Sequence, residues 1–238
     1  MTTDLRWGVM GTGRIAGKVL PLIHAADGCR VTCVASRSAQ RAGEFAAEMG
    51  LGSGAACTYD ELLEREDVDG VYVTIPNHLH GLWSIRLLEA GKHVLCEKPL
   101  TAFRAEAEEI FATAKRCDRL MVEGFMYMHH PQTARLVELA RTAHEPGSPI
   151  GPIKRYRSLR NVTNKDQYIL NTRLSHAMQG GAVMDIGCYP ISIALLVSGE
   201  EPIAESIRAS AEFAPQREGE SGRVDETCDF SWTFPSGA

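Results

Sequence analysis

The chain has 238 residues and 44% of them are hydrophobic, so it can bury a sizeable core as one large domain or two small ones. Its 25 basic and 30 acidic residues give a net charge of -5 and form no single-sign runs, which argues against nucleic acid or an anionic membrane as a partner. No segment has the length and apolarity of a membrane span or the pattern of a secretion signal. We therefore expect a cytoplasmic globular protein that binds a small molecule.

The first half of the chain alternates short apolar runs with helical patterns. Strands are expected over residues 5–10, 30–36, 70–75, 93–97 and 120–125, and helices over 14–26, 38–49, 59–65, 78–90 and 105–116. Repeated strand-then-helix units predict an α/β fold with a doubly wound parallel sheet of the Rossmann type over residues 1–125. Pro21 lies inside the first helical pattern and is expected to kink or shorten that helix.

The pattern changes after residue 125 to that of an α+β domain over residues 126–238. Helices are expected over 129–143 and 180–199, and strands over 153–162, 202–213 and 225–234. The last strand runs into a turn-like sequence at 234–238, where a hairpin partner should begin. The second domain is therefore expected to be incomplete at its C-terminal end.

A glycine-rich turn joins the first expected strand to the first helix. Its sequence, Gly11-Thr12-Gly13-Arg14-Ile15-Ala16, has the pattern G-x-G-x-x-A. The first glycine permits a tight turn, the second lets the backbone approach a pyrophosphate, and the N–H groups at the helix start face the phosphates. Such turns also serve packing alone, but the position between a strand and a helix favours a dinucleotide site.

The end of the second strand indicates which dinucleotide is bound. NAD sites usually place an acidic residue there for the ribose 2′-hydroxyl. This chain has Ser36 and Arg37 instead, with Arg41 in the following helix. Guanidinium groups form charge-assisted, bidentate hydrogen bonds with phosphate, so we expect NADP(H), with NAD(H) the less favoured cofactor. The alternative role for Arg37 is that of a solvated residue at a helix start.

The stretch KHVLCEKPLT, residues 92–101, ends an apolar strand on two charges and a proline. An ordinary solvated turn is one explanation for Glu97 and Lys98. Open α/β sheets, however, bind ligands at the carboxyl ends of their strands, so we interpret the turn as carrying Lys98 into a cleft, with Pro99 fixing its shape.

Asp185 and Tyr189 are four residues apart in an expected helix and so share one face. Helix capping and core packing are the alternative roles for these two residue types. A tyrosine is a weak acid until a nearby cation lowers its pKa, and Lys98 is the candidate cation. A Lys–Tyr pair beside a nicotinamide can move a proton while hydride moves to or from carbon.

No metal site is expected. The seven cysteines are scattered without a CxxC motif, and they are expected to be reduced and structural. His78, His80, His129 and His130 lack cysteine or carboxylate neighbours at metal-ligand spacing.

The sequences GVMGTGRIA, IPNHLH, CEKPL and GGAVMDIGCYP, in this order, resemble the family of glucose-fructose oxidoreductase, inositol dehydrogenase and related sugar dehydrogenases over essentially the whole chain. VEGFMYMHHPQ resembles the branch with dimeric dihydrodiol dehydrogenases, xylose dehydrogenases and deoxysugar 3-ketoreductases. The resemblance implies that Lys98 and Tyr189 are the catalytic pair and that Asp185 matches an aspartate used by inositol-type members. Besides the glycine turn, Ser36, Arg37 and Arg41, the residues assigned to the cofactor site are Ile75, Pro76, Asn77, His80, Glu97 and Lys98.

The resemblance also implies a substrate-binding second domain with an open, mainly antiparallel sheet that often forms dimers, in chains well beyond 238 residues. The expected function is NADP(H)-dependent hydride transfer between nicotinamide and a carbon of a sugar, deoxysugar or cyclic diol, in a homodimer or higher homo-oligomer. The alternatives are an NAD-dependent glycosidase of the same fold and a non-catalytic NADP(H)-binding module. Arg37 argues against the glycosidase, and the joint presence of Lys98 and Tyr189 argues against the binding module.

Overall fold

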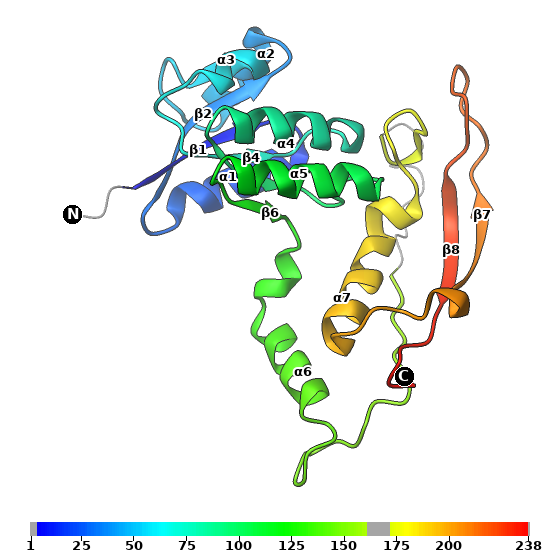
Figure 1. Ribbon diagram of the computed structural model, residues 1–238. Helices are drawn as coiled ribbons and strands as arrows, with labels where there is room; N and C mark the ends of the chain where they lie inside the picture. The colour runs from blue at the N-terminus through cyan, green and yellow to red at the C-terminus, as the bar shows by residue number, and fades with distance from the viewer. Residues whose placement is uncertain (1–3, 161–171, 238) are drawn as a thin grey trace. The chain divides into compact units, whose positions relative to one another are not determined.

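The computed structural model describes residues 4–160 and 172–237, which belong to two compact units, Met1–Gly124 and Phe125–Ala238 (Figure 1). The first unit contains a parallel sheet with helices between its strands, and the second contains helices and a two-stranded antiparallel sheet. The expected fold class, a Rossmann-type α/β unit followed by an α+β unit, is confirmed.

The first unit has six parallel strands in the order β3-β2-β1-β4-β5-β6. The strands are β1 (Leu5–Met10), β2 (Cys29–Ser36), β3 (Ala56–Thr58), β4 (Gly70–Val73), β5 (His93–Cys96) and β6 (Met121–Glu123). The helices are α1 (Arg14–Ala25), α2 (Ala39–Glu48), α3 (Tyr59–Leu63), α4 (His80–Glu89) and α5 (Arg104–Arg116). This strand order is that of a dinucleotide-binding fold, with its reversal between β1 and β4.

Alternating strand side chains divide the core of this unit into two apolar layers. Val9, Val34 and Tyr72 point to one face, where they pack with side chains of α1 and α2. Met10 and Val73 point to the other face, where they pack with side chains of α3, α4 and α5. Figure 1 shows α4 and α5 side by side on that second face. Each fully buried Val or Leu contributes about 1.5–3 kcal/mol, so both layers hold the strands in register.

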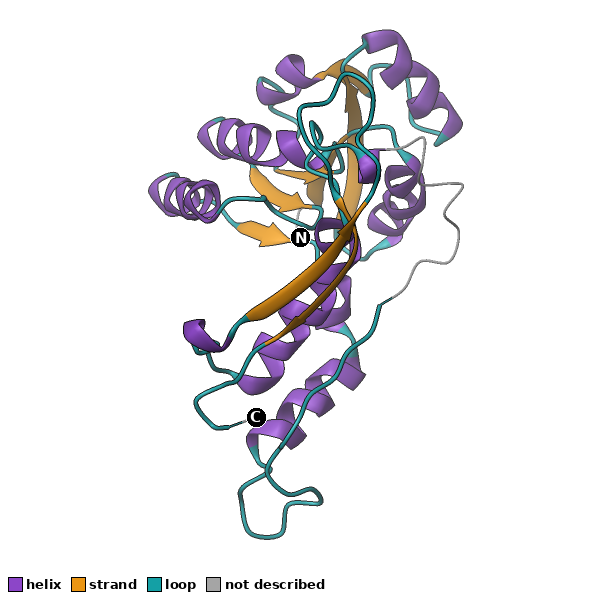
Figure 2. Ribbon diagram, turned by 90° about the vertical axis from the view of Figure 1, so that its right-hand side faces the viewer, coloured by secondary structure: helices purple, strands orange, loops and turns teal. Residues whose placement is uncertain are grey.

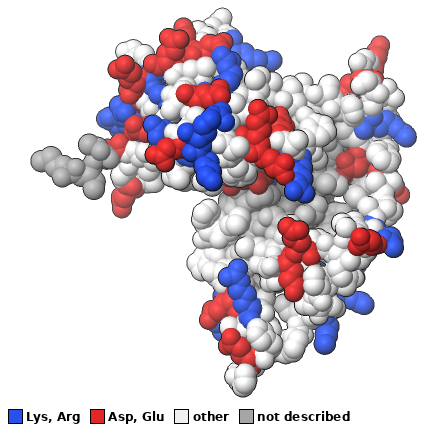
Figure 3. Space-filling view, viewed as in Figure 1, with Lys and Arg blue, Asp and Glu red and all other residues white. Residues whose placement is uncertain are grey.

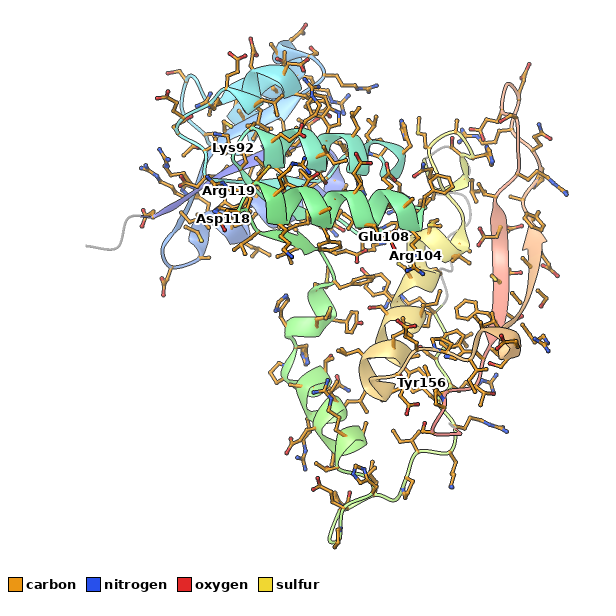
Figure 4. All side chains as sticks on the ribbon, in the orientation of Figure 1. Lys92, Arg104, Glu108, Asp118, Arg119 and Tyr156 are labelled. Atoms are coloured by element: carbon orange, nitrogen blue, oxygen red, sulfur yellow. The ribbon has the colours of Figure 1, made fainter. Side chains whose placement is uncertain are left out.

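Polar side chains brace the edge of the sheet at which β5 begins. The ammonium group of Lys92, labelled in Figure 4, donates to the carbonyl oxygens of Arg65 at 2.6 Å and Val68 at 3.0 Å. Burial lowers the pKa of Lys92. The guanidinium of Arg119 donates to the carbonyl oxygen of Gly91 at 2.7 Å. These bonds satisfy backbone carbonyls that the loops at this edge would otherwise leave without partners.

The second unit contains the helix α6 (Pro131–Arg141), a π-helical turn at Val183–Gly187 and the helix α7 (Cys188–Ser198). The strands β7 (Arg208–Phe213) and β8 (Asp225–Ser231) pair antiparallel, as Figure 2 shows. Short 3-10 turns occur in both units, at Asn77–Leu79, Met126–His129, Thr172–Leu174 and Ala204–Ser206.

Three local expectations are corrected. Residues 153–160, which include Tyr156 (labelled in Figure 4), form no strand, and residues 161–162 lie outside the described part of the chain. Alternation alone does not make a strand, because a strand also needs a partner for its backbone groups. The strand expected from residue 202 begins only at Arg208. Pro21 does not end α1, which continues to Ala25, while a kink at Pro21 stays a prediction.

Within the described residues no helix is both long and apolar enough to cross a membrane. On the face drawn in Figure 3, acidic and basic side chains are interspersed on each unit rather than gathered into a field of one sign. Cys33, Cys57 and Cys96 are buried, as expected for cysteines that serve as small apolar side chains.

Arg6, near the start of β1, and Asp69, the residue before β4, form a bidentate ion pair. Arg6 donates from Nε at 2.9 Å and from its terminal nitrogen at 2.6 Å, and its backbone N–H donates at 2.9 Å. The side-chain hydrogen bonds from Arg6 hold the pKa of Asp69 at about 2. Since this pKa is depressed, the pair stabilises the fold above the ordinary aspartate pKa and loses that effect as the pH falls towards 2.

We predict that Asp69→Asn lowers the Tm at pH 7 by about 2–4 °C, because the ion pair is partly exposed and screened by solvent. The difference from wild type should shrink as the pH falls from about 4 towards 2. Thermal unfolding over this pH range measures it. Asp60→Asn is the matched control. Asp60 forms an ion pair with Arg86 but is more exposed than Asp69, so this substitution should change the Tm little. An Asp69→Asn difference that is independent of pH contradicts the prediction.

Candidate active site

The carboxyl ends of the parallel strands gather the predicted cofactor residues of the first unit at one edge of the sheet. Residues 11–13 follow β1, residues 36–37 end and follow β2, residues 75–77 follow β4, and residues 97–98 follow β5. β1 and β4 are neighbours at the point where the strand order reverses. Open α/β sheets bind their ligands outside this edge, at such a reversal.

The turn after β1 fits closely against the end of β4. Gly11 has φ +111°, and a Cβ built on it would lie 2.5 Å from Oγ1 of Thr74. At Gly13, by contrast, a Cβ would have no atom within 4 Å. Gly13 is the N-cap of α1 and supplies no side-chain cap, so the first N–H groups of this helix are available to a ligand. A helix start of this kind suits a phosphate group.

Two positive side chains follow β2, Arg37 directly after the strand and Arg41 within α2. Arg37 and Arg41 are exposed, while Ser36 is only 4% exposed. Arg41 donates from Nε to Oγ1 of Thr12, at 2.9 Å, in the glycine turn. Burial raises the pKa of Tyr59, and the positive charges of Arg37 and Arg41 oppose this rise. The guanidinium groups, more than the hydroxyl of Ser36, are thus presented to an anionic group.

The loop after β4 is fastened by a buried histidine. Ile75 is buried, and Pro76 and Asn77 lead through a short 3-10 turn into α4. The first residue of α4, His80, is 1% exposed, and its ring nitrogens lie 2.8 Å from the carbonyl oxygens of Ile75 and Pro99. A direct contact of His80 with a cofactor stays a prediction.

The turn after β5 is held by hydrogen bonds on both sides of Lys98. The hydroxyl of Tyr72 donates to Oε1 of Glu97 at 2.5 Å, and the N–H of Lys98 donates to Oε2 of Glu97 at 3.3 Å. The N–H of Leu100 donates to Oε1 of Glu123 at 2.8 Å. Burial raises the pKa of Glu123. The backbone that carries Lys98 is thereby fixed relative to the sheet.

Asp185 and Tyr189 lie in the second unit, at the junction of the π-helical turn and α7. Nε of Arg173 forms an ion pair with Oδ2 of Asp185 at 2.8 Å. The start of the turn is capped from β8, because the N–H of Val183 donates to Oδ2 of Asp225 at 2.6 Å. π-helical turns occur mostly as single turns within α-helices and are frequent at functional sites.

The ring of Tyr189 is enclosed by aromatic and basic side chains. Its centroid lies 5.5 Å from that of Phe125 in an edge-on arrangement and 6.1 Å from that of Tyr127. The guanidinium of Arg160 lies 4.9 Å from the ring centroid. The hydroxyl of Tyr127 is hydrogen-bonded to Ser192 on α7 at 2.7 Å. Sequence reasoning missed this environment, since no spacing pattern connects its members.

The candidate residues therefore form two groups, each described within its own unit. Lys98 belongs to the first unit, and Asp185 and Tyr189 belong to the second. Among the described residues, no cluster of three or more His, Cys, Asp and Glu side chains is placed to hold a metal ion. The chemistry available is that of a turn suited to an anion and a lysine at a strand end in the first unit, and of the half-buried Asp185 and Tyr189 in the second.

Comparisons with known proteins agree with this division. The oxidoreductase family with an NAD-binding Rossmann fold matches residues 5–125, and the GFO/IDH/MocA C-terminal domain matches residues 147–238. The chain is 39% identical to dTDP-3,4-didehydro-2,6-dideoxy-alpha-D-glucose 3-reductase of Actinomadura kijaniata, over 83% of this chain and 57% of that enzyme. It is 36% identical to D-xylose 1-dehydrogenase (NADP(+)) 2 of Haloferax volcanii, over 82% and 58% of the two chains.

Solved structures show the same likeness. The crystal structure of a 3-ketoreductase from Actinomadura kijaniata in complex with NADP matches with a TM-score of 0.71 and 31% identity, over 99% of this chain and 67% of that chain. An aldose-aldose oxidoreductase from Caulobacter crescentus, complexed with glycerol, matches with a TM-score of 0.78 and 26% identity, over 99% and 69% of the chains. The chain spans less than two thirds of the length of the two curated relatives named above.

Proposed function

Because the chain belongs to the GFO/IDH/MocA oxidoreductase family, we propose that the protein transfers hydride between NADP(H) and a carbon of a sugar, deoxysugar or cyclic diol. The observation that carries this proposal is the common sheet edge from which the glycine turn after β1 and Lys98 after β5 both project. A phosphate-binding helix start and a lysine at one edge are what a nicotinamide-dependent enzyme needs.

The fit of the first unit to a dinucleotide rests on its own geometry. Because Gly11 has no Cβ, the turn can pass close to Thr74, and the space at Gly13 is open. Together these features would leave room for a pyrophosphate beside the start of α1. Arg37 and Arg41 would hold a ribose 2′-phosphate by charge-assisted hydrogen bonds. Residues 75–77 and Glu97 would border the nicotinamide ribose. When bound, NADPH would supply the hydride.

In the proposed reaction, Tyr189, Lys98 and Asp185 serve the transfer of one proton. In the direction of reduction, Tyr189 gives its phenolic proton to the carbonyl oxygen while the carbon gains hydride, so that an alcohol results. Lys98 stabilises the resulting phenolate by its positive charge. Asp185, oriented by Arg173, accepts a hydrogen bond from a substrate hydroxyl. The names of the relatives, a deoxysugar 3-reductase and a D-xylose dehydrogenase, support a carbohydrate substrate.

Self-association and a cytoplasmic location stay predictions of the sequence. Every residue of β7 is exposed, which is compatible with packing of a second copy of the protein, or of another segment, against this strand.

The experiment that tests the function uses the full-length protein with a panel of aldoses, deoxysugars and cyclic diols, each with NADP and with NAD. We expect oxidation of at least one member, with net formation of NADPH. Release of free sugar from a glycoside without net NADPH formation would support the glycosidase instead. Tight binding of NADPH without turnover of any member, or of its keto form, would support the non-catalytic module.

We predict that Arg37→Ala weakens NADPH binding by roughly 10- to 100-fold and leaves NADH binding almost unchanged, because only NADPH carries the 2′-phosphate. Fluorescence titration with both cofactors measures this. Arg30→Ala is the matched control, since Arg30 is an exposed arginine near the other end of β2. Equal losses for the two cofactors would show that the 2′-phosphate assignment is wrong.

We predict that Tyr189→Phe lowers turnover by roughly 10²- to 10⁴-fold with little change in NADPH affinity, as is typical for the loss of a positioned acid or base. Lys98→Met should lose most activity, and the two losses should be far from additive because the residues act as one unit. Steady-state kinetics on the best substrate of the panel measure both. Tyr156→Phe is the control within the second unit. A Tyr189→Phe enzyme that keeps more than about a third of wild-type turnover, where chemistry limits the rate, defeats the assignment.

A further inference from the structure

The turn that carries Lys98 is held by side chains from three different elements. Tyr72 of β4 donates to the side chain of Glu97, and Glu123 of β6 accepts from the backbone N–H of Leu100. The third is His80 of α4, whose Nδ1 lies 2.8 Å from the carbonyl oxygen of Pro99. These supports act on Glu97, Pro99 and Leu100, within two residues of Lys98, so they restrict the position of its backbone.

His80 differs from the other two supports because it holds a second loop as well. Its Nε2 lies 2.8 Å from the carbonyl oxygen of Ile75, in the loop after β4. One rigid ring thus spans the backbones of the loops that follow β4 and β5. At 1% exposure the ring is removed from solvent, so water does not compete for these bonds. The separation of the two loops is set by the width of an imidazole.

The chemistry of the ring restricts how both bonds are made. A neutral imidazole donates from one nitrogen, whereas an imidazolium donates from both. Burial lowers the pKa of His80, against the hydrogen bonds to Pro99 and Ile75 and the negative charges of Glu97 and Glu106. A neutral ring has a single N–H for these two carbonyl oxygens and so makes only one of the two hydrogen bonds, whereas a ring that carries both N–H groups makes both. The bond to Pro99 is the one that bears on Lys98, because Pro99 is its immediate neighbour.

We propose that His80 is a positioning residue for Lys98, which it aligns through the hydrogen bond that Nδ1–H donates to the carbonyl oxygen of Pro99, while Nε2 lies against the carbonyl oxygen of Ile75 in the loop after β4. This inference rests on the proposed catalytic role of Lys98. In this inference His80 acts through the backbone of Pro99, since its ring is only 1% exposed and both ring nitrogens lie against backbone carbonyls. Its contribution is to the placement of the ammonium group, where an error of about 1 Å can cost about 10²-fold in rate.

The alternative is that His80 only stabilises the first unit. In that case its loss would lower the Tm without lowering kcat below the unfolding transition. Leu87→Ala supplies this comparison, since Leu87 is fully buried two helical turns further along α4 and packs in the apolar core. It should destabilise the protein through a cavity and leave kcat close to that of wild type.

The experiment compares His80→Asn, His80→Gln and His80→Leu in the full-length enzyme. The amide nitrogen of Asn can stand at the place of Nδ1 and keep the bond to Pro99, and that of Gln can stand at the place of Nε2 and keep the bond to Ile75. We expect His80→Leu and His80→Gln to lower kcat by about 10²-fold. His80→Asn should keep kcat within about fivefold of wild type, and all three should change the Kd for NADPH by less than about fivefold.

A double variant tests whether His80 acts through Lys98. Adding His80→Leu to Lys98→Met should cost no further kcat, because the group being positioned is already absent. A further loss of the full 10²-fold size would overturn the inference. So would a well-folded His80→Leu enzyme that keeps more than about a third of wild-type kcat, or recovery of kcat by Gln and not by Asn.

Two measurements separate failure of this inference from failure of the proposed function. If Lys98→Met keeps normal turnover, the proposed catalytic role of Lys98 is wrong. If Lys98→Met is inactive but His80→Leu is normal, only the role of His80 is wrong. Amide hydrogen exchange reports on the turn without any substrate. Exchange at Lys98 and Leu100 should speed up in His80→Leu and His80→Gln but not in His80→Asn, and equal exchange in all three variants overturns the inference.

Discussion

The missing side chain at Gly11 is the constraint on which the rest of the first unit's site depends. β1 and β4 are neighbours in the sheet, so the chain leaving β1 must pass the end of β4 at close range. A Cβ at Gly11 would lie 2.5 Å from Oγ1 of Thr74 and 3.1 Å from its carbonyl oxygen, and the φ of +111° disfavours any other residue. Because this approach is possible, α1 can begin at the sheet edge with its first N–H groups accessible.

The parallel arrangement separates stability from chemistry within this unit. All strands point the same way, so the loops that precede them lie at one edge and the loops that follow them lie at the other. The ion pair of Arg6 and Asp69 and the carbonyl contacts of Lys92 brace the first edge. The buried polar side chains near the second edge, Tyr72 and His80, are bonded to the turns that the proposed function uses. The same polar chemistry thus supports the fold at one edge and orders a site at the other.

The sequence predicted the parts of this protein that depend on local pattern. Apolar periodicity and glycine chemistry were sufficient for the parallel strands, except β3, whose three residues are too few to show a period. The alternation of apolar and polar residues at 153–160 predicted a strand that does not form. Such alternation indicates which face of a segment is apolar, but not whether a second strand is present to pair with it. The sequence analysis assigned His80 to the cofactor site, which stays a prediction, but did not predict its contacts with the carbonyls of Ile75 and Pro99, because these join segments that no spacing rule connects.

The helix that carries Asp185 and Tyr189 shows why a motif is not sufficient to define a site. A spacing of four residues predicts a common face on an α-helix, but the chain forms a π-helical turn through Val183–Gly187. Such a turn is rare because its backbone geometry is less favourable, so it needs support from outside the helix.

That support comes from residues distant in sequence. Asp225 on β8 accepts a hydrogen bond from the start of the turn, and Arg173 pairs with Asp185 within it. Gly181, at φ +119°, leaves space for the carboxylate of Asp225, which a side chain there would occupy. The start of the turn that carries Asp185 is therefore bonded to Asp225, a residue of β8 that is paired with β7. The antiparallel sheet consequently has a role beyond its own packing, since it fixes the helical turn on which the proposed proton transfer relies.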